Sequence, residues 1–158
     1  MPQSEIKRAV DKCYRWLAYR ARTEYELRRK LESAGFSPAV VDMALTGMKE
    51  KKLLDDQIFA VNWVRRRLSA KPVGAGRLWA ELRQKGVDGE IIAVALDGYD
   101  EESELEAAMR LARKKFAGSG GGSDLRRLAG FLTRRGFSGS VVAKVCRRIA
   151  GDDRFDIS

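Results

Sequence analysis

The chain has 158 residues, and its 31 Lys and Arg outnumber its 22 Asp and Glu, giving a formal net charge of +9. It contains no histidine, which removes the commonest general base and metal ligand, and its two cysteines give no disulfide framework. No apolar run approaches the roughly 20 residues of a membrane span, and the N-terminus carries no secretory signal. We therefore expect a soluble cytoplasmic protein that is not an enzyme and has no metal or cofactor.

The first part of the chain has the pattern of three helices. Apolar residues at helical spacing mark the first one: Ile6, Ala9, Val10, Cys13 and Leu17. The second begins at the capping box Thr23-x-x-Glu26 and ends at Gly35, where glycine suits a left-handed helix stop. The third begins with Ser37 as N-cap and Pro38 in the first helical position.

The pattern around Gly35 is written three times. The copies read Leu27-x3-Leu31-x3-Gly35-Phe36-x3-Val40-Val41, Leu78-x3-Leu82-x3-Gly86-Val87-x3-Ile91-Ile92 and Leu128-x3-Leu132-x3-Gly136-Phe137-x3-Val141-Val142. In each copy the glycine fits the C′ position, and the next residue can contact the leucine at C3 in a Schellman stop. A period of this length indicates tandem units that cannot bury their apolar faces alone.

A further helix precedes each of the two later copies. Residues 56–68, capped by Asp55, are apolar on most sides, which predicts a helix buried between its neighbours. Another apolar stripe marks the first helix of the third repeat: Leu105, Ala108, Met109, Ala112 and Phe116. The stretches 70–76 and 118–123 read as exposed connections, the second as a plain Gly/Ser linker.

These patterns predict an all-α fold without strands. We expect three tandem three-helix repeats, each containing a helix-turn-helix, in an elongated, solenoid-like array. The predicted boundaries are 1–52, 53–98 and 99–150, followed by a flexible tail over 151–158.

The positive charge is concentrated in the third repeat. Between Ala107 and Arg148 there are eleven basic residues and only one acidic residue, Asp124. Some of these cations stand near helix C-termini, where they interact favourably with the helix dipole. The excess of Arg, which can donate two hydrogen bonds to one phosphate or carboxylate, favours an anionic partner over a merely solvated face. The candidate contact residues are Arg65, Arg66, Arg67, Arg83, Lys85, Arg113, Lys114, Lys115, Arg126, Arg127, Arg134 and Arg135.

The helix-turn-helix units do not have the composition of sequence readers. Their third helices begin with apolar or acidic residues, as in Pro38-Ala39-Val40-Val41 and Gly89-Glu90-Ile91-Ile92, instead of polar base-reading side chains. Trp16 and Trp63 are expected to pack, whereas Trp79 is open to either packing or base stacking. A nucleic-acid-binding protein without sequence specificity is therefore one function that the residues allow.

Several longer motifs resemble the RecX family. They cover the whole chain in order: Leu17-Ala18-x-Arg20-x-Arg22-x3-Glu26-Leu27-x2-Lys30-Leu31, Leu53-Leu54-Asp55-Asp56-x2-Phe59-Ala60-x2-Trp63-Val64-Arg65, Leu82-Arg83-Gln84-Lys85-Gly86-Val87-Asp88, Leu111-Ala112-x-Lys114-Lys115 and Leu132-x-Arg134-Arg135-Gly136-Phe137-Ser138. The resemblance implies a bacterial regulator of the RecA recombinase, expected as a monomer. Such a regulator binds the groove of the RecA–single-stranded-DNA filament and inhibits its ATPase, strand-exchange and coprotease activities, with a role in DNA repair, recombination and the SOS response. The alternative is a helical repeat protein that binds nucleic acid without a recombinase partner.

Overall fold

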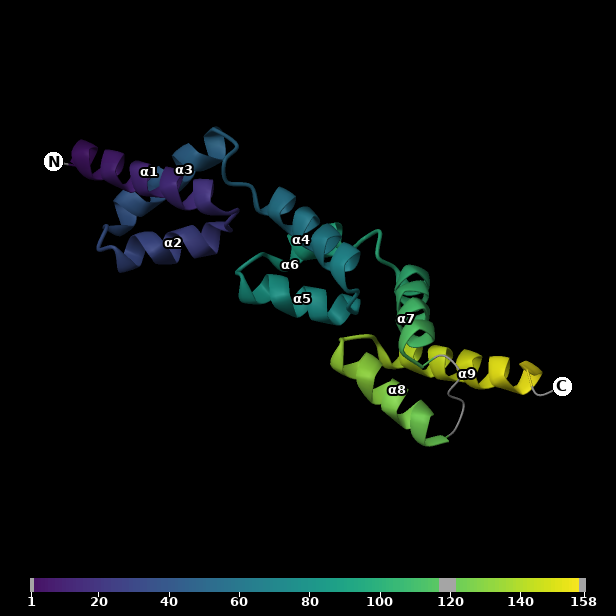
Figure 1. The fold of residues 1–158 in the computed structure, drawn as a ribbon. Coiled ribbons are helices and arrows are strands. Elements are labelled where there is room, and N and C mark those ends of the chain that lie inside the picture. Colours follow the sequence, from purple (N-terminus) through teal and green to yellow (C-terminus); the bar gives the residue numbers. More distant parts are fainter. Residues whose placement is uncertain (1, 117–121, 157–158) are drawn as a thin grey trace. The chain divides into compact units, whose positions relative to one another are not determined.

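The computed structural model describes residues 2–116 and 122–156, and this part of the chain forms nine α-helices and no strand. The predicted all-α fold is confirmed, and the helices follow one another through short connections (Figure 1). Their bounds are α1 Pro2–Tyr19, α2 Glu24–Ser33, α3 Pro38–Glu50, α4 Asp56–Ala70, α5 Ala75–Gln84, α6 Gly89–Ala95, α7 Glu101–Phe116, α8 Gly122–Arg134 and α9 Gly139–Asp156.

The three predicted helix stops are present. The turn glycines Gly35, Gly86 and Gly136 have φ of 93°, 83° and 85°, in the left-handed region that favours glycine. At the first turn, the Phe36 N–H donates to the Leu31 carbonyl over 3.3 Å, and the Gly35 N–H donates to the Glu32 carbonyl over 3.0 Å. The same two bonds recur at the other two glycines, so all three turns are Schellman motifs.

The predicted helix starts are capped by side chains. Thr23 and Glu26 form both bonds of a capping box at α2. The Ser37 hydroxyl accepts from the backbone at the start of α3, and the Asp55 carboxylate accepts from two N–H groups in the first turn of α4. Ser138 repeats the arrangement at α9.

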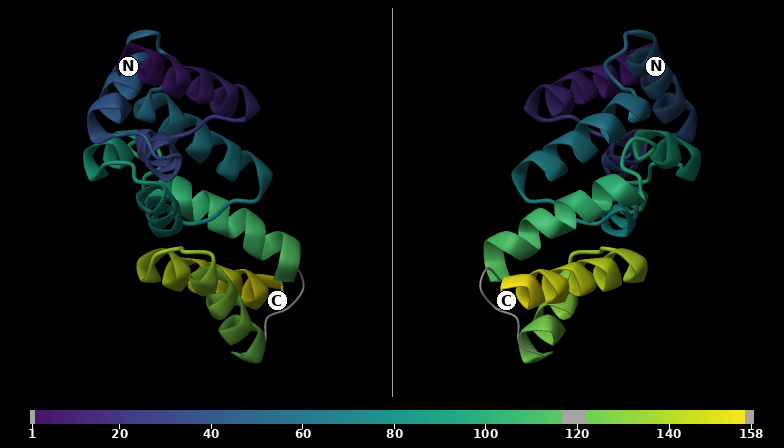
Figure 2. Two further views of the ribbon diagram at one scale, coloured as in Figure 1. Left: turned by 90° about the vertical axis from the view of Figure 1, so that its left-hand side faces the viewer. Right: turned by 90° about the vertical axis from the view of Figure 1, so that its right-hand side faces the viewer.

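The chain divides into two compact units. The first unit comprises Met1–Trp63 with Leu82–Ala93, and the second comprises Val64–Glu81 with Val94–Ser158. The middle repeat therefore contributes residues to both units. Within the first unit α3 packs against α1 and α2, and within the second α9 packs against α7 and α8, as both views of Figure 2 show.

Each unit has its own apolar core. Most of the first core comes from α1, α2 and α3, with Leu27, Leu31 and Val41 fully buried. The second core comes from α7, α8 and α9, with Ala108, Leu132 and Val145 fully buried. Both cysteines lie on these apolar stripes as predicted: Cys13 is buried, where desolvation raises its thiol pKa to about 11, and Cys146 packs at the edge of the second core.

One prediction about the helices was wrong in detail: the helix over residues 56–68 is not buried on most of its sides. Phe59, Ala60 and Val64 on α4 are buried, but Ile58 and Val61 are 56% and 41% exposed, so this helix is buried along one stripe only. The helix α9 continues through Gly151 to Asp156, past residue 150, whereas the predicted bounds of the repeats themselves stay a prediction. A glycine inside a helix costs only about 1 kcal/mol relative to alanine and does not by itself end it. Residues 118–121 of the predicted linker 118–123 lie outside the described residues. The helix α8 begins at Gly122, within the predicted linker.

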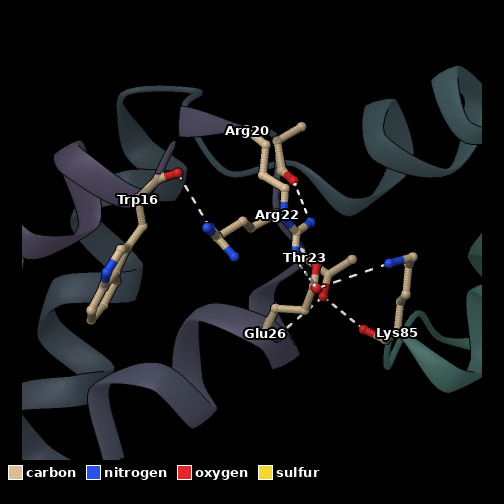
Figure 3. A network of polar contacts seen from close by, with 7 residues as sticks. Trp16, Arg20, Arg22, Thr23, Glu26 and Lys85 are labelled. Atoms are coloured by element: carbon tan, nitrogen blue, oxygen red, sulfur yellow. Dashed lines mark hydrogen bonds and ion pairs between the residues drawn. The ribbon is translucent and has the colours of Figure 1, made fainter. Parts of the chain in front are cut away.

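In the first unit, the turn at Gly86 packs against the start of α2. Figure 3 shows the preceding residue of this turn, Lys85, beside Thr23. The fully buried Thr23 hydroxyl donates to the Lys85 carbonyl over 2.7 Å while it accepts from the Glu26 N–H over 3.2 Å. One side chain thus caps α2 and joins the first repeat to the second. We call this contact between the start of α2 and the turn at Gly86 the first joint. An added Cβ at Gly86 would overlap the Cβ of Tyr25, so this joint also requires a glycine.

The second unit contains the equivalent joint between the second and third repeats. In this second joint, Gly74 occupies the position in the second repeat that Thr23 occupies in the first. The Gly74 N–H donates to the Arg135 carbonyl over 2.8 Å. The buried Glu104 carboxylate lies beside this contact, and its Oε1 accepts from the Ala75 N–H over 3.4 Å and the Ser138 N–H over 3.2 Å. A single carboxylate of α7 therefore holds the starts of α5 and α9 together.

Candidate basic interface

The twelve predicted contact residues are distributed unequally between the units. Only Arg83 and Lys85 belong to the first unit, and the other ten belong to the second. Nine of the twelve are exposed, and three are half-buried: Arg67, Lys85 and Arg135. The second unit therefore carries most of the candidate interface.

Two of the half-buried cations are engaged within the chain. The Arg67 guanidinium contacts the Glu81 carboxylate over 3.0 Å. The Lys85 ammonium lies 4.6 Å from the centre of the Trp63 ring. It also lies 4.0 Å from the Glu26 carboxylate (Figure 3). These contacts give Arg67 and Lys85 a role in packing, one that charge clustering in the sequence did not reveal.

Arg135 is the third half-buried cation. Its guanidinium lies 5.0 Å from the centre of the Phe131 ring, and its carbonyl accepts the hydrogen bond of the second joint. Its Nε is buried and has no hydrogen-bond acceptor among the described residues. Arg135 thus belongs to the framework of the second unit more than to its surface.

The helix α8 presents its cations to solvent. Leu128 and Leu132 are buried in the core of the second unit, whereas Arg126, Arg127 and Arg134 are exposed. Arg127 is only loosely engaged, because its side chain is 77% exposed and its nearest carboxylate oxygen, on Asp124, is 3.9 Å away. The amphipathic pattern of this helix therefore fixes a solvated basic face.

A groove in the second unit brings together cations that lie far apart in the sequence. We call it the α4–α7 groove; it has a volume of about 570 Å³ and lies between the end of α4 with its following loop, the C-terminal half of α7, and α8. Its cations are Lys71, Arg110, Lys114 and Lys115. Lys114 and Lys115 are among the predicted contact residues, but Lys71 and Arg110 are not. Neither of these two stands directly beside another cation in the sequence.

The tryptophans show how aromatic side chains are used in this protein. Trp16 packs against the first core, and Trp63 stacks on Phe59 with ring centres 6.1 Å apart, so the predicted packing of both is confirmed. Trp79 on α5 is 40% exposed and stays available for contact.

Other kinds of site find little support in the part of the chain that the structure describes. Among the side chains that the structure describes, no three of His, Cys, Asp or Glu lie where they could jointly hold a metal ion. Within residues 2–116 and 122–156, no helix combines the length and the apolar character needed to cross a membrane.

Comparison with known proteins gives a consistent result along the chain. Family models match in order: RecX, first three-helix domain, at residues 9–46; RecX, second three-helix domain, at residues 55–96; and RecX, third three-helix domain, at residues 101–146. The regulatory protein RecX of Mycobacterium sp. (strain JLS) is 42% identical over 154 residues, covering 91% of this chain and 84% of the relative. That of Amycolatopsis mediterranei (strain U-32) is 39% identical over 139 residues, covering 86% and 79%.

Solved structures show the same fold. The crystal structure of RecX from Lactobacillus salivarius has a TM-score of 0.84 at 20% sequence identity, covering 93% of this chain and 97% of that chain. A second crystal structure, of regulatory protein RecX, has a TM-score of 0.79 at 27% identity, covering 91% of this chain and 72% of the other.

Proposed function

The chain belongs to the RecX family, and from this premise we propose that it regulates the RecA recombinase by binding the RecA–single-stranded-DNA filament. The regulation is inhibitory and lowers ATP hydrolysis, strand exchange and coprotease activity. The observation that carries the proposal is the match of all three family domains, in order, over residues 9–146. Relatives of at least 39% identity over most of the chain are named regulatory proteins.

The exposed cations of the second unit support an anionic target. A filament of protein on single-stranded DNA offers phosphates and acidic side chains along its length, and many exposed Arg and Lys side chains contact such a target with modest energy each. In this proposal Arg126, Arg127 and Arg134 on α8 contribute to binding, with Arg65, Arg66 and Arg113 on α4 and α7.

Charge reversal on α8 tests this proposal. Arg126→Glu with Arg127→Glu should raise the concentration needed for half-inhibition of RecA ATP hydrolysis by roughly tenfold or more, since two attractions become repulsions. The pair is preferable to a variant that includes Arg135, whose side chain packs on Phe131. Helical content, followed by circular dichroism, should not change.

A matched control removes the same charge elsewhere. Lys7→Glu with Arg15→Glu changes two exposed cations of α1 in the first unit and lowers the net charge equally. We expect this control to inhibit nearly as well as the natural chain. Equal loss in both variants, or full inhibition by the α8 variant, would remove the α8 face from the proposal.

The alternative function, binding of nucleic acid without a recombinase partner, is favoured only by the exposed cations. It predicts an affinity for single-stranded DNA whose logarithm falls with the logarithm of salt, by about 0.7 per neutralised phosphate. It also predicts that RecA activity changes only when this protein occupies the DNA itself. Measuring DNA binding and RecA inhibition at the same salt concentrations separates the two functions.

A further inference from the structure

The α4–α7 groove combines a basic rim with an apolar floor. Leu68 and Pro72 lie on one side, and Leu111 and Phe131 form the other apolar part of the lining. Leu68, Pro72 and Leu111 are half-buried, so their apolar surface remains partly open to a ligand. The volume of about 570 Å³ lies within the range of about 300–1,000 Å³ that is usual for ligand pockets.

The charge of the groove is strongly positive. None of the ten described residues that line it is acidic, and four carry a positive charge. The last turns of α4 and α7 also line the groove, and each helix C-terminus contributes about −0.5 of a charge. The helix ends therefore offset only about one of the four positive charges, which leaves about +3 to attract an anion.

The aromatic ring of the groove is poorly placed to stack on a base. The Lys115 ammonium lies 4.1 Å from the centre of the Phe131 ring, the Arg135 guanidinium lies 5.0 Å from it, and Phe116 packs against it at a tilt of 58°. Phe131 is only 9% exposed. Single-stranded nucleic acid is normally held by open aromatic faces, and this ring offers little of either face.

We propose that the α4–α7 groove binds an acidic, amphipathic peptide segment of a partner protein. Carboxylates of the segment pair with Lys71, Arg110 and Lys114 at the rim, while its apolar side chains cover Leu68, Pro72 and Leu111. Charge complementarity selects the acidic residues, and the open apolar floor distinguishes such a segment from a purely acidic one. This assignment does not depend on the identity of the filament that the protein regulates.

Fluorescence anisotropy with a labelled eight-residue peptide of alternating Glu and Leu tests the proposal on the full chain. The double variant Lys71→Glu/Arg110→Glu, which changes two exposed side chains, should weaken binding by about tenfold or more, because two ion pairs are replaced by repulsion. The matched control Arg147→Glu/Arg148→Glu changes two exposed cations of α9 outside the groove lining and should bind nearly as well as the natural chain.

Three comparison ligands complete the test. An alternating Gln–Leu peptide should bind at least several-fold more weakly, as should an all-Glu peptide, because each lacks one half of the match. Equal weakening in both double variants would overturn the proposal in favour of general charge attraction. It would equally be overturned by no binding of the Glu–Leu peptide, or by an oligothymidine whose binding is lost only in Lys71→Glu/Arg110→Glu, which would make the groove a nucleic-acid site.

Discussion

Gly86 is required for two separate physical reasons, whereas Gly35 is required for one. Both have a positive φ, which costs an alanine about 1–2 kcal/mol. At Gly35 an added Cβ meets no atom within 4 Å, but at Gly86 it overlaps the Cβ of Tyr25, which cannot move without shifting α2. The two glycines thus allow the helix stop and the joint between repeats to be measured separately.

We predict that Gly86→Ala destabilises the protein more than Gly35→Ala. Gly35→Ala should lower the free energy of unfolding by about 1–2 kcal/mol. Gly86→Ala should lower it by about 1–3 kcal/mol more, through overpacking against Tyr25. Urea unfolding followed by circular dichroism measures both, and equal losses would show that the contact with Tyr25 does not contribute.

The Glu26 carboxylate links the stability of the first joint to pH. Burial raises the pKa of this carboxyl. Hydrogen bonds from Arg20 and the Thr23 N–H, together with the charges of Arg20 and Lys85, lower it by more, so the net pKa is below the ordinary value (Figure 3). A lowered folded-state pKa means that the ionised group stabilises the protein above the unfolded pKa of about 4.3. This contribution is lost as the pH falls through the folded-state pKa.

We therefore predict that Glu26→Gln lowers the free energy of unfolding at pH 7 and that the difference from the natural chain shrinks toward pH 3. Urea unfolding at several pH values gives this difference directly. Glu50→Gln, at an exposed position near the end of α3, serves as the control and should show little difference at either pH. A Glu26→Gln effect of the same size at pH 3 and pH 7 would contradict the assignment.

At the scale of elements, α7 holds its neighbours through Glu104. This side chain is 6% exposed, and the same oxygen accepts from the N–H groups of Ala75 and Ser138. Removing it leaves both helix starts without their acceptor, which is costly where water has poor access.

Glu104→Ala should lower the free energy of unfolding by about 2–4 kcal/mol. Glu104→Gln keeps the accepting Oε1 and should lose clearly less, while Glu102→Ala, at an exposed position of the same helix, should be nearly neutral. Hydrogen exchange at the amides of Ala75 and Ser138 provides a local readout. Similar losses for the Ala and Gln variants at position 104 would mean that the acceptor role is unimportant.

The helices and turns could be predicted because their signals are local. An i,i+4 leucine pair followed by a glycine specifies a Schellman stop, and Thr23-x-x-Glu26 specifies a capping box within four residues. The joints could not be predicted in this way. The Thr23 hydroxyl meets a backbone carbonyl 62 positions away, and a carbonyl acceptor is not marked by any residue type.

The candidate site was predicted only where cations are adjacent in the sequence. Lys114 and Lys115 stand side by side and are among the predicted contact residues, whereas Lys71 and Arg110 come together only when the loop after α4 packs beside α7. Clustering also selected Lys85, whose ammonium contacts the Trp63 ring and the Glu26 carboxylate within the chain. Net charge in a sequence window locates a basic surface but does not separate its packing cations from its free ones.

At the scale of the whole molecule, each repeat depends on the next. The turn that ends the second helix of a repeat also supplies a carbonyl to the preceding repeat. In the first unit this is the Lys85 carbonyl, which accepts from Thr23, and in the second it is the Arg135 carbonyl, which accepts from Gly74. Stability in such proteins is a sum of repeats and of nearest-neighbour interfaces. The excess positive charge is superimposed on this framework, and most predicted contact residues lie in the second unit.

The most direct test of the proposed function is ATP hydrolysis by RecA on single-stranded DNA, titrated with this protein. The salt concentration should be one at which the protein alone no longer binds that DNA, so that competition for DNA is removed. The account predicts dose-dependent inhibition at well below one molecule per RecA protomer. Unchanged hydrolysis at every ratio would contradict it and leave nucleic-acid binding without a recombinase partner as the better description.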